Sequence, residues 1–587
     1  MAVQESAGKF KIEIDGTEVP KDVDNLLTSA IVDSNLHQPD LFLLSFRDPD
    51  RTVLSKTGAK VGSKVKVTAF STAAPSGDLL LTGDVTALEV EHDGAGTFTV
   101  LRGYDESHLL FRGRYTETYQ NMTAADIAQK VAQRANLQPG QIDSTSPVFP
   151  YVSQNNSNDW LFLKKLAGDI GYEVLVVDGK LFFRQPASSS AGPSAGSLTD
   201  TSDPLALTMG AHILRLRSVV TSADQVGQVE VRGWDPTQKQ KVVSTASAGT
   251  TSASVGTSPT SLASIFGNAT LYGVGVPYSN QTEVDTAAKA LADHISSAFA
   301  ELEGVARGNS KLRAGVAISL SLVGDPFDGK YTLTSVRHKY EASDGYTTAF
   351  TVSGRNQRSL LGLASAGSPG AGPGASAPPI AGVVPALVTD VNDPNQLGRV
   401  KLSFPWLSDS FTSDWARMVQ IGAGNNRGAS FLPEVNDEVL VAFEQGDWRR
   451  PYVIGLLHNG VDKPMQGSNL IDSSSGAVRR RGLISKNGHA LIFFDDSSAN
   501  GAALMTGDHN LRISLNAGTT TVKVSSTGTV EIEATQDISI KSSAGITVEA
   551  QNDLSLKGQS VSINAQGSVS ISGTADVTVT GTPIKLN

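Results

Sequence analysis

Apolar residues recur in pairs of the form apolar-x-apolar from residue 522 to the end of the sequence. Within a pair, the alternation with a polar residue places both apolar side chains on one face of a strand. Successive pairs begin 8, 8, 8, 8, 7, 8, 8 and 7 residues apart. The pairs are Val522/Val524, Val530/Ile532, Ile538/Ile540, Ile546/Val548, Leu554/Leu556, Val561/Ile563, Val569/Ile571, Val577/Val579 and Ile584/Leu586. This spacing predicts stacked repeats, each a short strand followed by a tight corner.

Three arrangements are compatible with a chain of such repeats. A disordered tail has no reason to keep a period of β-branched pairs. A single-chain β-helix with three repeats per turn would have only about three turns and an open end. In the third arrangement, three identical chains wind around one axis, where their apolar pairs meet. We therefore predict an intertwined triple-stranded β-helix, a rod on the order of 40 Å long. Its trimer core is formed by the pairs from Val522/Val524 to Val577/Val579.

The sequence before residue 363 predicts a large, mainly β region that helices interrupt. Alternating strand patterns are found in "KFKIEID" (9–15), "KVKVTAF" (64–70) and "TFTVLRG" (97–103). Helical patterns cover residues 123–137, 159–171 and 284–299. Thr123, three residues before Asp126, is expected to cap the first of these helices. Two low-complexity stretches, 186–201 and 244–264, are expected to be loops.

The chain divides most clearly at "LASAGSPGAGPGASAPP", residues 363–379, whose composition is that of a linker. Residues 380–460 then read as a five-stranded barrel of the oligonucleotide/oligosaccharide-binding (OB) type. Its strands are expected in "ALVTDV", "GRVKLSF", "ARMVQIG", "EVLVAFE" and "PYVIGLL". The predicted domains are thus 1–362, a linker, the barrel at 380–460, a neck at 461–521 and the β-helix at 522–587.

The composition restricts partners and compartment. The chain of 587 residues carries a net charge of −10, which argues against nucleic acid as a partner. It contains no cysteine, so disulfides and thiolate chemistry are excluded. We expect no signal segment at the start, and no apolar run reaches the length of about 18 residues that a membrane span needs. The protein is therefore expected to be made in the cytoplasm without a signal peptide.

No motif in the sequence points clearly to catalysis or metal binding. "GPSAG" (192–196) matches the G-x-S-x-G pattern, but it lies in a Ser/Ala/Gly-rich stretch rather than between a strand and a helix. The nine histidines show no familiar ligand spacing. The acidic clusters "EHD" (91–93) and "FDDS" (494–497) are more typical of solvated turns. We expect no enzyme activity, no cofactor and no metal site.

Several segments resemble VgrG-type spike proteins, which fuse a phage-type hub to a tail spike in contractile injection systems. The barrel and neck carry the resemblance in residues 388–406, 413–419, 431–460 and 486–497. The matching positions include Pro433, Glu434, Asp437, Glu438, Phe443, Gly446, Asp447, Arg450, Pro451 and Gly455. Residues 156–184 and 308–350 resemble the late-control, hub-type half of the same family.

The resemblance implies a homotrimeric spike at the end of an inner tube, which pierces the target envelope when a sheath contracts and helps to carry effectors. Implied partners are the inner tube protein, baseplate proteins, effector cargo and, transiently, the target membrane. Only about 60 residues separate Gly460 from Val522, too few for the lysozyme domain that some phage relatives carry there. The opening segment favours a phage-tail-like particle, either cytoplasmic or released. A type VI secretion spike is the alternative, and a cell-wall-degrading tail enzyme is a weaker one.

The resemblance also implies a use for the extreme C-terminus, "GTPIKLN". A triple β-helix ends with unpaired strand edges and an exposed apolar end, both of which attract a partner. In the family, a small PAAR-type tip protein caps this end. We expect the docking platform for such a tip to be formed by Pro583, Ile584, Lys585, Leu586 and Asn587. The alternative is that these residues are simply the last, uncapped repeat.

Overall fold

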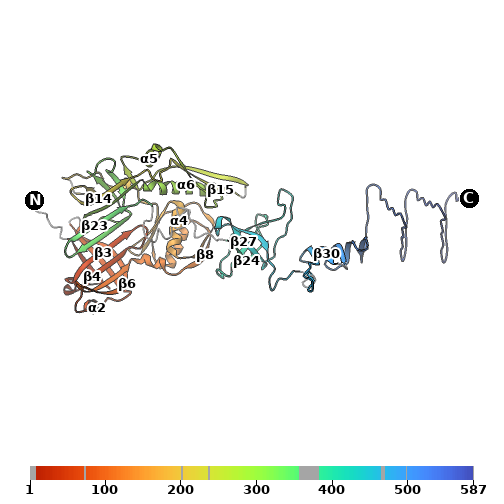
Figure 1. The fold of residues 1–587 in the computed structure, drawn as a ribbon, viewed down its shortest axis with the longest axis horizontal. Coiled ribbons are helices and arrows are strands. Elements are labelled where there is room, and N and C mark those ends of the chain that lie inside the picture. The colour runs from red at the N-terminus through yellow and green to blue at the C-terminus, as the bar shows by residue number, and fades with distance from the viewer. Residues whose placement is uncertain are drawn as a thin grey trace. The chain divides into compact units, whose positions relative to one another are not determined.

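The computed structural model describes residues 8–71, 74–199, 202–235, 238–355, 382–464, 470–496 and 499–585. The chain forms two compact units, Met1–Lys463 and Pro464–Asn587. Strands predominate over helices, which confirms the predicted mainly β fold (Figure 1). The predicted linker, 363–379, lies outside the described residues.

The first unit is organised by one large antiparallel sheet with the strand order β14-β19-β23-β22-β3-β4-β7-β6-β5-β1-β2. In chain order these strands are β1 (Lys9–Ile14), β2 (Thr17–Glu18), β3 (Leu27–Asn35), β4 (Leu41–Arg47), β5 (Lys64–Ser71), β6 (Ala74–Asp93), β7 (Gly96–Tyr104), β14 (Ile213–Val220), β19 (Ala300–Arg307), β22 (Ser335–Glu341) and β23 (Gly345–Val352). The three strands predicted at 9–15, 64–70 and 97–103 are β1, β5 and β7, so these predictions are confirmed.

The large sheet contributes to two hydrophobic cores. Around β1, β3–β7 and the short helices α1 (Lys21–Asp24) and α2 (Val53–Thr57), alternate residues such as Phe10, Ile12 and Ile14 are buried. The other end packs against a small sheet ordered β13-β20-β21-β17, with Tyr331 and Phe350 in the shared core. The small sheet consists of β13 (Ala206–Thr208), β17 (Ala253–Val255), β20 (Ala317–Ser321) and β21 (Gly329–Thr332).

Two helix-on-sheet layers complete this part of the first unit. Helices α3 (Ala124–Arg134) and α4 (Asp159–Ile170) share one core with the sheet β11-β12-β9 and the two-stranded sheet β10-β8. Helix α6 (Gln281–Ser296) covers the sheet β16-β15-β18. These strands are β8 (Tyr115–Met122), β9 (Gln138–Ile142), β10 (Phe149–Ser157), β11 (Glu173–Val177), β12 (Lys180–Arg184), β15 (Gln228–Asp235), β16 (Gln240–Ser247) and β18 (Thr270–Gly273).

The three predicted helices are confirmed as α3, α4 and α6. The Thr123 hydroxyl accepts from the Asp126 backbone N–H at 3.2 Å, and the Asp126 carboxylate accepts from the Thr123 N–H at 2.9 Å. This capping box satisfies two donors that the first helical turn leaves unpaired. Asn158 and Asn280 cap the starts of α4 and α6 with their side chains.

The expectation of a loop at 244–264 is wrong. Strand β17 and helix α5 (Pro259–Ile265) lie within this stretch. Ser258 accepts from the Ser261 N–H at 3.2 Å, and Pro259 occupies the first turn, where its missing N–H costs nothing. The low-complexity composition thus concealed the start of a helix that Ser258 caps and Pro259 begins. In the stretch 186–201, the described residues contain only the short 3-10 helix η2 (Ser189–Ala191).

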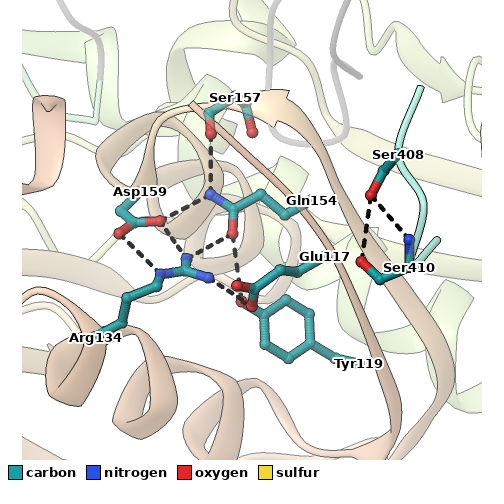
Figure 2. Close-up of polar contacts among 8 residues, drawn as sticks. All are labelled: Glu117, Tyr119, Arg134, Gln154, Ser157, Asp159, Ser408 and Ser410. Carbon is teal, nitrogen blue, oxygen red and sulfur yellow. Dashed lines mark hydrogen bonds and ion pairs between the residues drawn. The ribbon is translucent and has the colours of Figure 1, made fainter. Parts of the chain in front are cut away.

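A polar network ties the strand pair β8-β10 to both helices of its layer (Figure 2). The Arg134 guanidinium of α3 pairs with Asp159 at the start of α4 and with Glu117 of β8. Gln154 of β10 accepts from Arg134 at 2.8 Å and donates to Asp159, also at 2.8 Å. Buried polar groups satisfied on several sides hold their elements in one arrangement. The strand pair is therefore fixed to α3 and α4.

His338 of β22 is fully buried and held on both ring nitrogens. Its Nδ1 lies 2.7 Å from the Tyr346 hydroxyl, and its Nε2 lies 3.0 Å from the Leu312 carbonyl oxygen. Because a carbonyl can only accept, Nε2 carries the proton and Nδ1 accepts from Tyr346. Burial, reinforced by the nearby Arg313 cation, lowers the pKa of His338 to about 3.

We predict that His338 makes the first unit sensitive to acid. A histidine with a depressed pKa must stay neutral in the fold, so its contribution to stability is lost as the pH falls from about 6.5 toward 3. Between pH 7 and pH 5 the free energy of unfolding should fall by about 2 kcal/mol from this group. Asp40, whose pKa burial raises to about 7, changes stability in the opposite direction. Urea unfolding of His338→Gln at both pH values isolates the histidine, because the change in the free energy of unfolding from pH 7 to pH 5 should become more favourable than in the natural chain by about 2 kcal/mol; an equal change in both chains would contradict the prediction.

The five predicted barrel strands are all present and form one sheet ordered β25-β24-β27-β28-β26. Phe404 lies at the centre of the barrel core, with the rings of Trp406, Phe411, Phe443 and Trp448 at 5.6–6.1 Å. The strands are β24 (Val383–Asp390), β25 (Lys401–Ser403), β26 (Arg417–Met418), β27 (Glu438–Phe443) and β28 (Pro451–Leu456).

The second unit contains an antiparallel meander followed by the repeats. The meander consists of β29 (Arg480–Ile484), β30 (Ala490–Asp496), β31 (Ala499–Met505), β32 (Leu511–Asn516) and β33 (Thr521–Ser526). Residues 527–585 contain neither helix nor strand (Figure 1). The sequence predicts short strands there, but a strand needs a hydrogen-bonded neighbour, and one chain alone supplies none. Across the described ranges, each helix is too short or too polar to cross a membrane.

Candidate interaction surfaces

The meander β29–β33 has two faces of different character. Its register aligns Leu483, Leu491, Leu504, Ile513 and Val524 in one row across all five strands. The neighbouring row on the same face runs through Phe493, Ala502, Leu515 and Val522. Because side chains alternate between the faces of a sheet, both rows lie on one face, which is apolar apart from Arg481, aligned with Phe493, and its ion-pair partner Asp495.

This apolar face is uncovered in the single chain. Its large side chains are 38–70% exposed, namely Leu483, Leu491, Phe493, Leu504, Leu511, Ile513, Leu515, Val522 and Val524. Fully burying one such side chain stabilises a protein by about 1.5–3 kcal/mol. A contiguous exposed apolar face of this kind marks an interaction surface.

The opposite face of the meander has only a small core within the chain. Ala490, Ile492, Ala503 and Met505 are buried there, with Ile484 and Phe494 partly buried against them. Arg512 and Lys523 stand on this same face, beside Met505 and Ser514 in the register. Because so few apolar groups are buried, we infer that the sheet needs its uncovered face covered in order to be stable.

In the repeats after the meander, the apolar side chains have nearly the same exposed fractions in every octad. From Val530 to Val579, the first member of each pair is 53–58% exposed and the second 66–73%. An irregular coil would not reproduce the same pair of values seven times. The residues between the members are exposed as well, as Ser539 and Thr547 illustrate. The chain is thus regular, and its apolar pairs are without cover.

The repeat residues predicted to form the core of a trimer are exposed in the single chain. The more exposed second members are Ile532, Ile540, Val548, Leu556, Ile563, Ile571 and Val579. The less exposed first members are Val530, Ile538, Ile546, Leu554, Val561, Val569 and Val577. The reason is physical: an octad has a single apolar face, and the predicted core needs such a face from each of three chains. Burial of these pairs in a trimer therefore stays a prediction.

The surface predicted for a tip protein is only partly described. Ile584 is 48% exposed, and Pro583 and Lys585 are exposed as well. Leu586 and Asn587 lie outside the described residues. The docking role of residues 583–587 therefore stays a prediction.

The uncovered apolar surface starts earlier in the chain than the repeat pattern predicts. The predicted start is Val522, whereas the uncovered face also includes seven large residues from Leu483 to Leu515. The signal was present in "LRISLN", where Leu511, Ile513 and Leu515 alternate with polar residues. It was missed because the strands of the meander are spaced further apart than the repeat pairs, so their apolar residues do not follow the eight-residue period.

The residues considered for catalysis are not assembled into a site. Residues 192–196 follow η2 rather than a strand, and the Ser194 and Gly196 carbonyls accept from the hydroxyls of Ser319 and Ser321 in β20. His92 lies 2.9 Å from the Thr97 hydroxyl in the β6–β7 hairpin. Asp495 pairs with Arg481. Over the ranges that the structure describes, no three His, Asp or Glu side chains are grouped to hold a metal ion.

Two family models match the sequence. The type VI secretion system/phage-baseplate injector OB domain matches residues 384–458, which are the barrel strands β24 to β28. The Alg8 N-terminal domain matches residues 62–342, less than half of the chain. The first match agrees with the barrel predicted from the sequence.

Individual relatives match parts of the chain. The type VI secretion system spike protein VgrG1a of Pseudomonas aeruginosa is 39% identical over 69 residues, 11% of each chain. A probable baseplate hub protein of Escherichia phage 186 is 32% identical over 116 residues, 19% of this chain and 29% of that protein. Such matches span less than a third of the length of the curated relatives.

The fold as a whole is also found in a solved structure. A chain of the Francisella PdpA–VgrG complex aligns over 88% of both chains with a TM-score of 0.52, at 10% sequence identity. At that identity the likeness shows a shared fold. The barrel family and the spike and hub relatives support a VgrG-type spike, and the chain is thus similar to VgrG-type spike proteins in its matched parts and shares their fold.

Proposed function

We propose that three copies of this chain form the central spike at the end of the inner tube of a contractile injection system. The observation that carries the proposal is the uncovered apolar face of β29–β33, together with the repeat pairs that follow it. Three identical faces around one axis would bury each other, so no other protein is needed to cover them. A closed arrangement also leaves no open sheet edge along the rod.

The repeat suits a rod that must be narrow and stiff. Within each octad the apolar pair turns to the axis, and Ser, Thr or Lys between its members meets water. Backbone groups that find no partner in one chain would pair between chains at each level. The rod would therefore resist bending along its length, which is what piercing an envelope requires when a sheath contracts.

The remaining parts of the chain would connect this rod to the particle. Residues 1–355 would contact the inner tube and baseplate proteins, and the barrel would form the neck of the spike. The spike would help to carry effectors and would contact the target membrane only transiently. The named relatives are spike and hub proteins, and we propose that this chain likewise acts mechanically and is not an enzyme.

The mass of the protein in native solution tests the proposal. The chain has a mass of 61.4 kDa, and a trimer has three times that mass. A trimer with strong β-structure in the repeats supports the spike. A monodisperse monomer with full β-structure would overturn it, because the apolar rows would then be covered in some other way.

The particle is proposed to be phage-tail-like, with a type VI secretion system as the alternative. Relatives of both kinds match the chain, the phage 186 hub protein over 116 residues and the Pseudomonas spike over 69. Copurification of the tagged chain with its sheath and tube proteins decides between them. A free, tail-like particle supports the first, and a membrane-anchored assembly the second.

We predict that residues 583–587 are needed for tip binding but not for trimer assembly. Deleting them removes the last apolar layer and leaves the eight repeat pairs before it. The truncated chain should therefore remain a trimer and lose binding of a PAAR-type tip protein, as measured by pull-down and by calorimetry. Trimer retention serves as the internal control. If the truncated trimer binds the tip with unchanged affinity, the docking platform lies elsewhere.

A further inference from the structure

The loop between β27 and β28 is built as a rigid turn. Its 3-10 helix η4 (Glu444–Gly446) places Gln445 and Gly446 at φ of 52° and 77°. The loop closes on itself through backbone bonds from Glu444 N–H to the Arg450 carbonyl (3.0 Å) and from Asp447 N–H to the Glu444 carbonyl (2.9 Å). The loop thus has one well-defined shape. It contains Gly446, Asp447 and Arg450, which carry the family resemblance but which the spike function does not explain.

An ion pair inside this loop is largely removed from water. Asp447 accepts from Arg449 Nη2 at 2.7 Å and from Nε at 3.1 Å, and also from the Arg449 backbone N–H at 2.9 Å. The Asp447 side chain is 5% exposed and that of Arg449 is 24% exposed. Two charges so far out of water need good partners on all sides, or the loop would be destabilised.

Some of those partners lie outside the barrel, in the helix-on-sheet layers. Burial alone would raise the pKa of Asp447, but Arg449, together with Lys165 of α4, lowers it well below its usual range. Burial would likewise lower the pKa of Arg449, but Asp447, together with Asp169 of α4 and Glu283 of α6, raises it. Charged groups of α4 and α6, two helices that pack on each other, therefore act electrostatically on this loop.

A direct hydrogen bond also joins the loop to the hub region. Arg450 donates from Nε to the Pro277 carbonyl at 3.2 Å, just before the start of α6. Glu283 is held in place by the Ser279 N–H at 2.8 Å. The Tyr151 ring of β10 meets Phe411 edge-on at 6.4 Å and joins the barrel core. The strand pair β8-β10 that carries Tyr151 is the one fixed by the Arg134 network (Figure 2).

We infer that the loop Glu444–Arg450 is a clip that fastens the barrel to the hub region, with Arg449 as the cation shared by both sides. Its partner is this chain's own surface, formed by α4 and by the start of α6 with the residues just before it. The clip lies within one chain, so the inference does not depend on trimer assembly. If the proposed spike function holds, the clip would pass the thrust of the tube from the hub to the needle.

Hydrogen–deuterium exchange of the full chain tests the clip. Arg449→Met removes the shared charge and keeps most of the side-chain volume. We expect exchange to become at least about tenfold faster in hub peptides covering 165–169 and 277–283, because Asp447 is left buried without its cation and the attraction of Arg449 for Asp169 and Glu283 is lost. Arg449→Lys, which keeps the charge, should restore part of the protection.

The barrel offers a closely matched control in Arg399→Met. Arg399 donates to Asp393 at 2.6 Å, and the two side chains are 21% and 3% exposed, much like the pair in the clip. Its guanidinium also lies over the Trp415 ring, so both contacts belong to the barrel itself. This substitution should speed exchange around residues 391–400 and leave the hub peptides unchanged. Equal effects of both substitutions on the hub peptides would overturn the inference.

A variant on the hub side covers the case in which Arg449→Met fails to fold. Asp169→Asn with Glu283→Gln removes two negative charges that raise the pKa of Arg449 and leaves the barrel sequence intact. Faster exchange of the loop peptide 444–450 in this double variant supports the clip. Unchanged exchange of that peptide means that the barrel does not depend on the hub at this contact, and the inference fails.

Discussion

Ile540→Asp is expected to prevent assembly of the full-length chain into a trimer. Ile540 belongs to the third repeat pair and is 72% exposed in the single chain. In the proposed spike its three copies meet on the axis, where three carboxylates would lie close together and out of water. Each unpaired buried charge costs several kcal/mol, so the total exceeds about 10 kcal/mol per trimer. Sedimentation at micromolar concentration should show a monomer.

The adjacent Ser539→Asp provides the matched control. Ser539 lies between the two members of the same pair and points to the opposite side of the strand. The same charge there would face water, and the trimer should form as in the natural chain. If both substitutions are tolerated, the apolar pairs do not lie on a shared axis. If both prevent assembly, added charge rather than its position is responsible.

The barrel and the three long helices could be predicted because their signals are local. In β27, "EVLVAF", buried and partly exposed residues alternate along the whole strand. Helix α3 begins where the Thr123–Asp126 capping box requires it. In such elements, the local periodicity and the capping residues agree with the final packing, so the sequence alone is sufficient to predict the element. Helix α5 was missed because its Ser- and Thr-rich turn resembles a loop in composition.

The interaction surfaces could be predicted only in part, because they depend on contacts between distant segments. The eight-residue period revealed the repeat pairs, but Leu483 and Ile513 join the same apolar face only through the register of β29–β33. Similarly, Asp447 and Arg450 were recognised as family positions, but the bond from Arg450 to Pro277 and the electrostatic effect of Lys165 on Asp447 follow from the tertiary fold. Local patterns identify an element and its apolar face. They do not identify the surface against which that face packs.

Ile513→Asp is expected to prevent trimer assembly as well, although it lies outside the repeats. Ile513 stands in the row that crosses all five strands of the meander, between Leu504 and Val524, and is 48% exposed in the single chain. If three meanders close on one another, the substitution places three carboxylates in their common core. The cost is of the same order as for the repeats, several kcal/mol per charge. Native mass measurement and circular dichroism should show a monomer with reduced strand content.

The neighbouring Arg512→Asp separates position from charge in the same strand. Arg512 is exposed and lies on the opposite face of the sheet, aligned with Met505. Its substitution changes the charge by two units, more than Ile513→Asp does, and yet the trimer should persist. A trimer that tolerates Ile513→Asp but not Ile540→Asp would mean that the axis begins only at the repeats. The apolar face of the meander would then bind a different partner, because its nine large exposed side chains would still have to be buried.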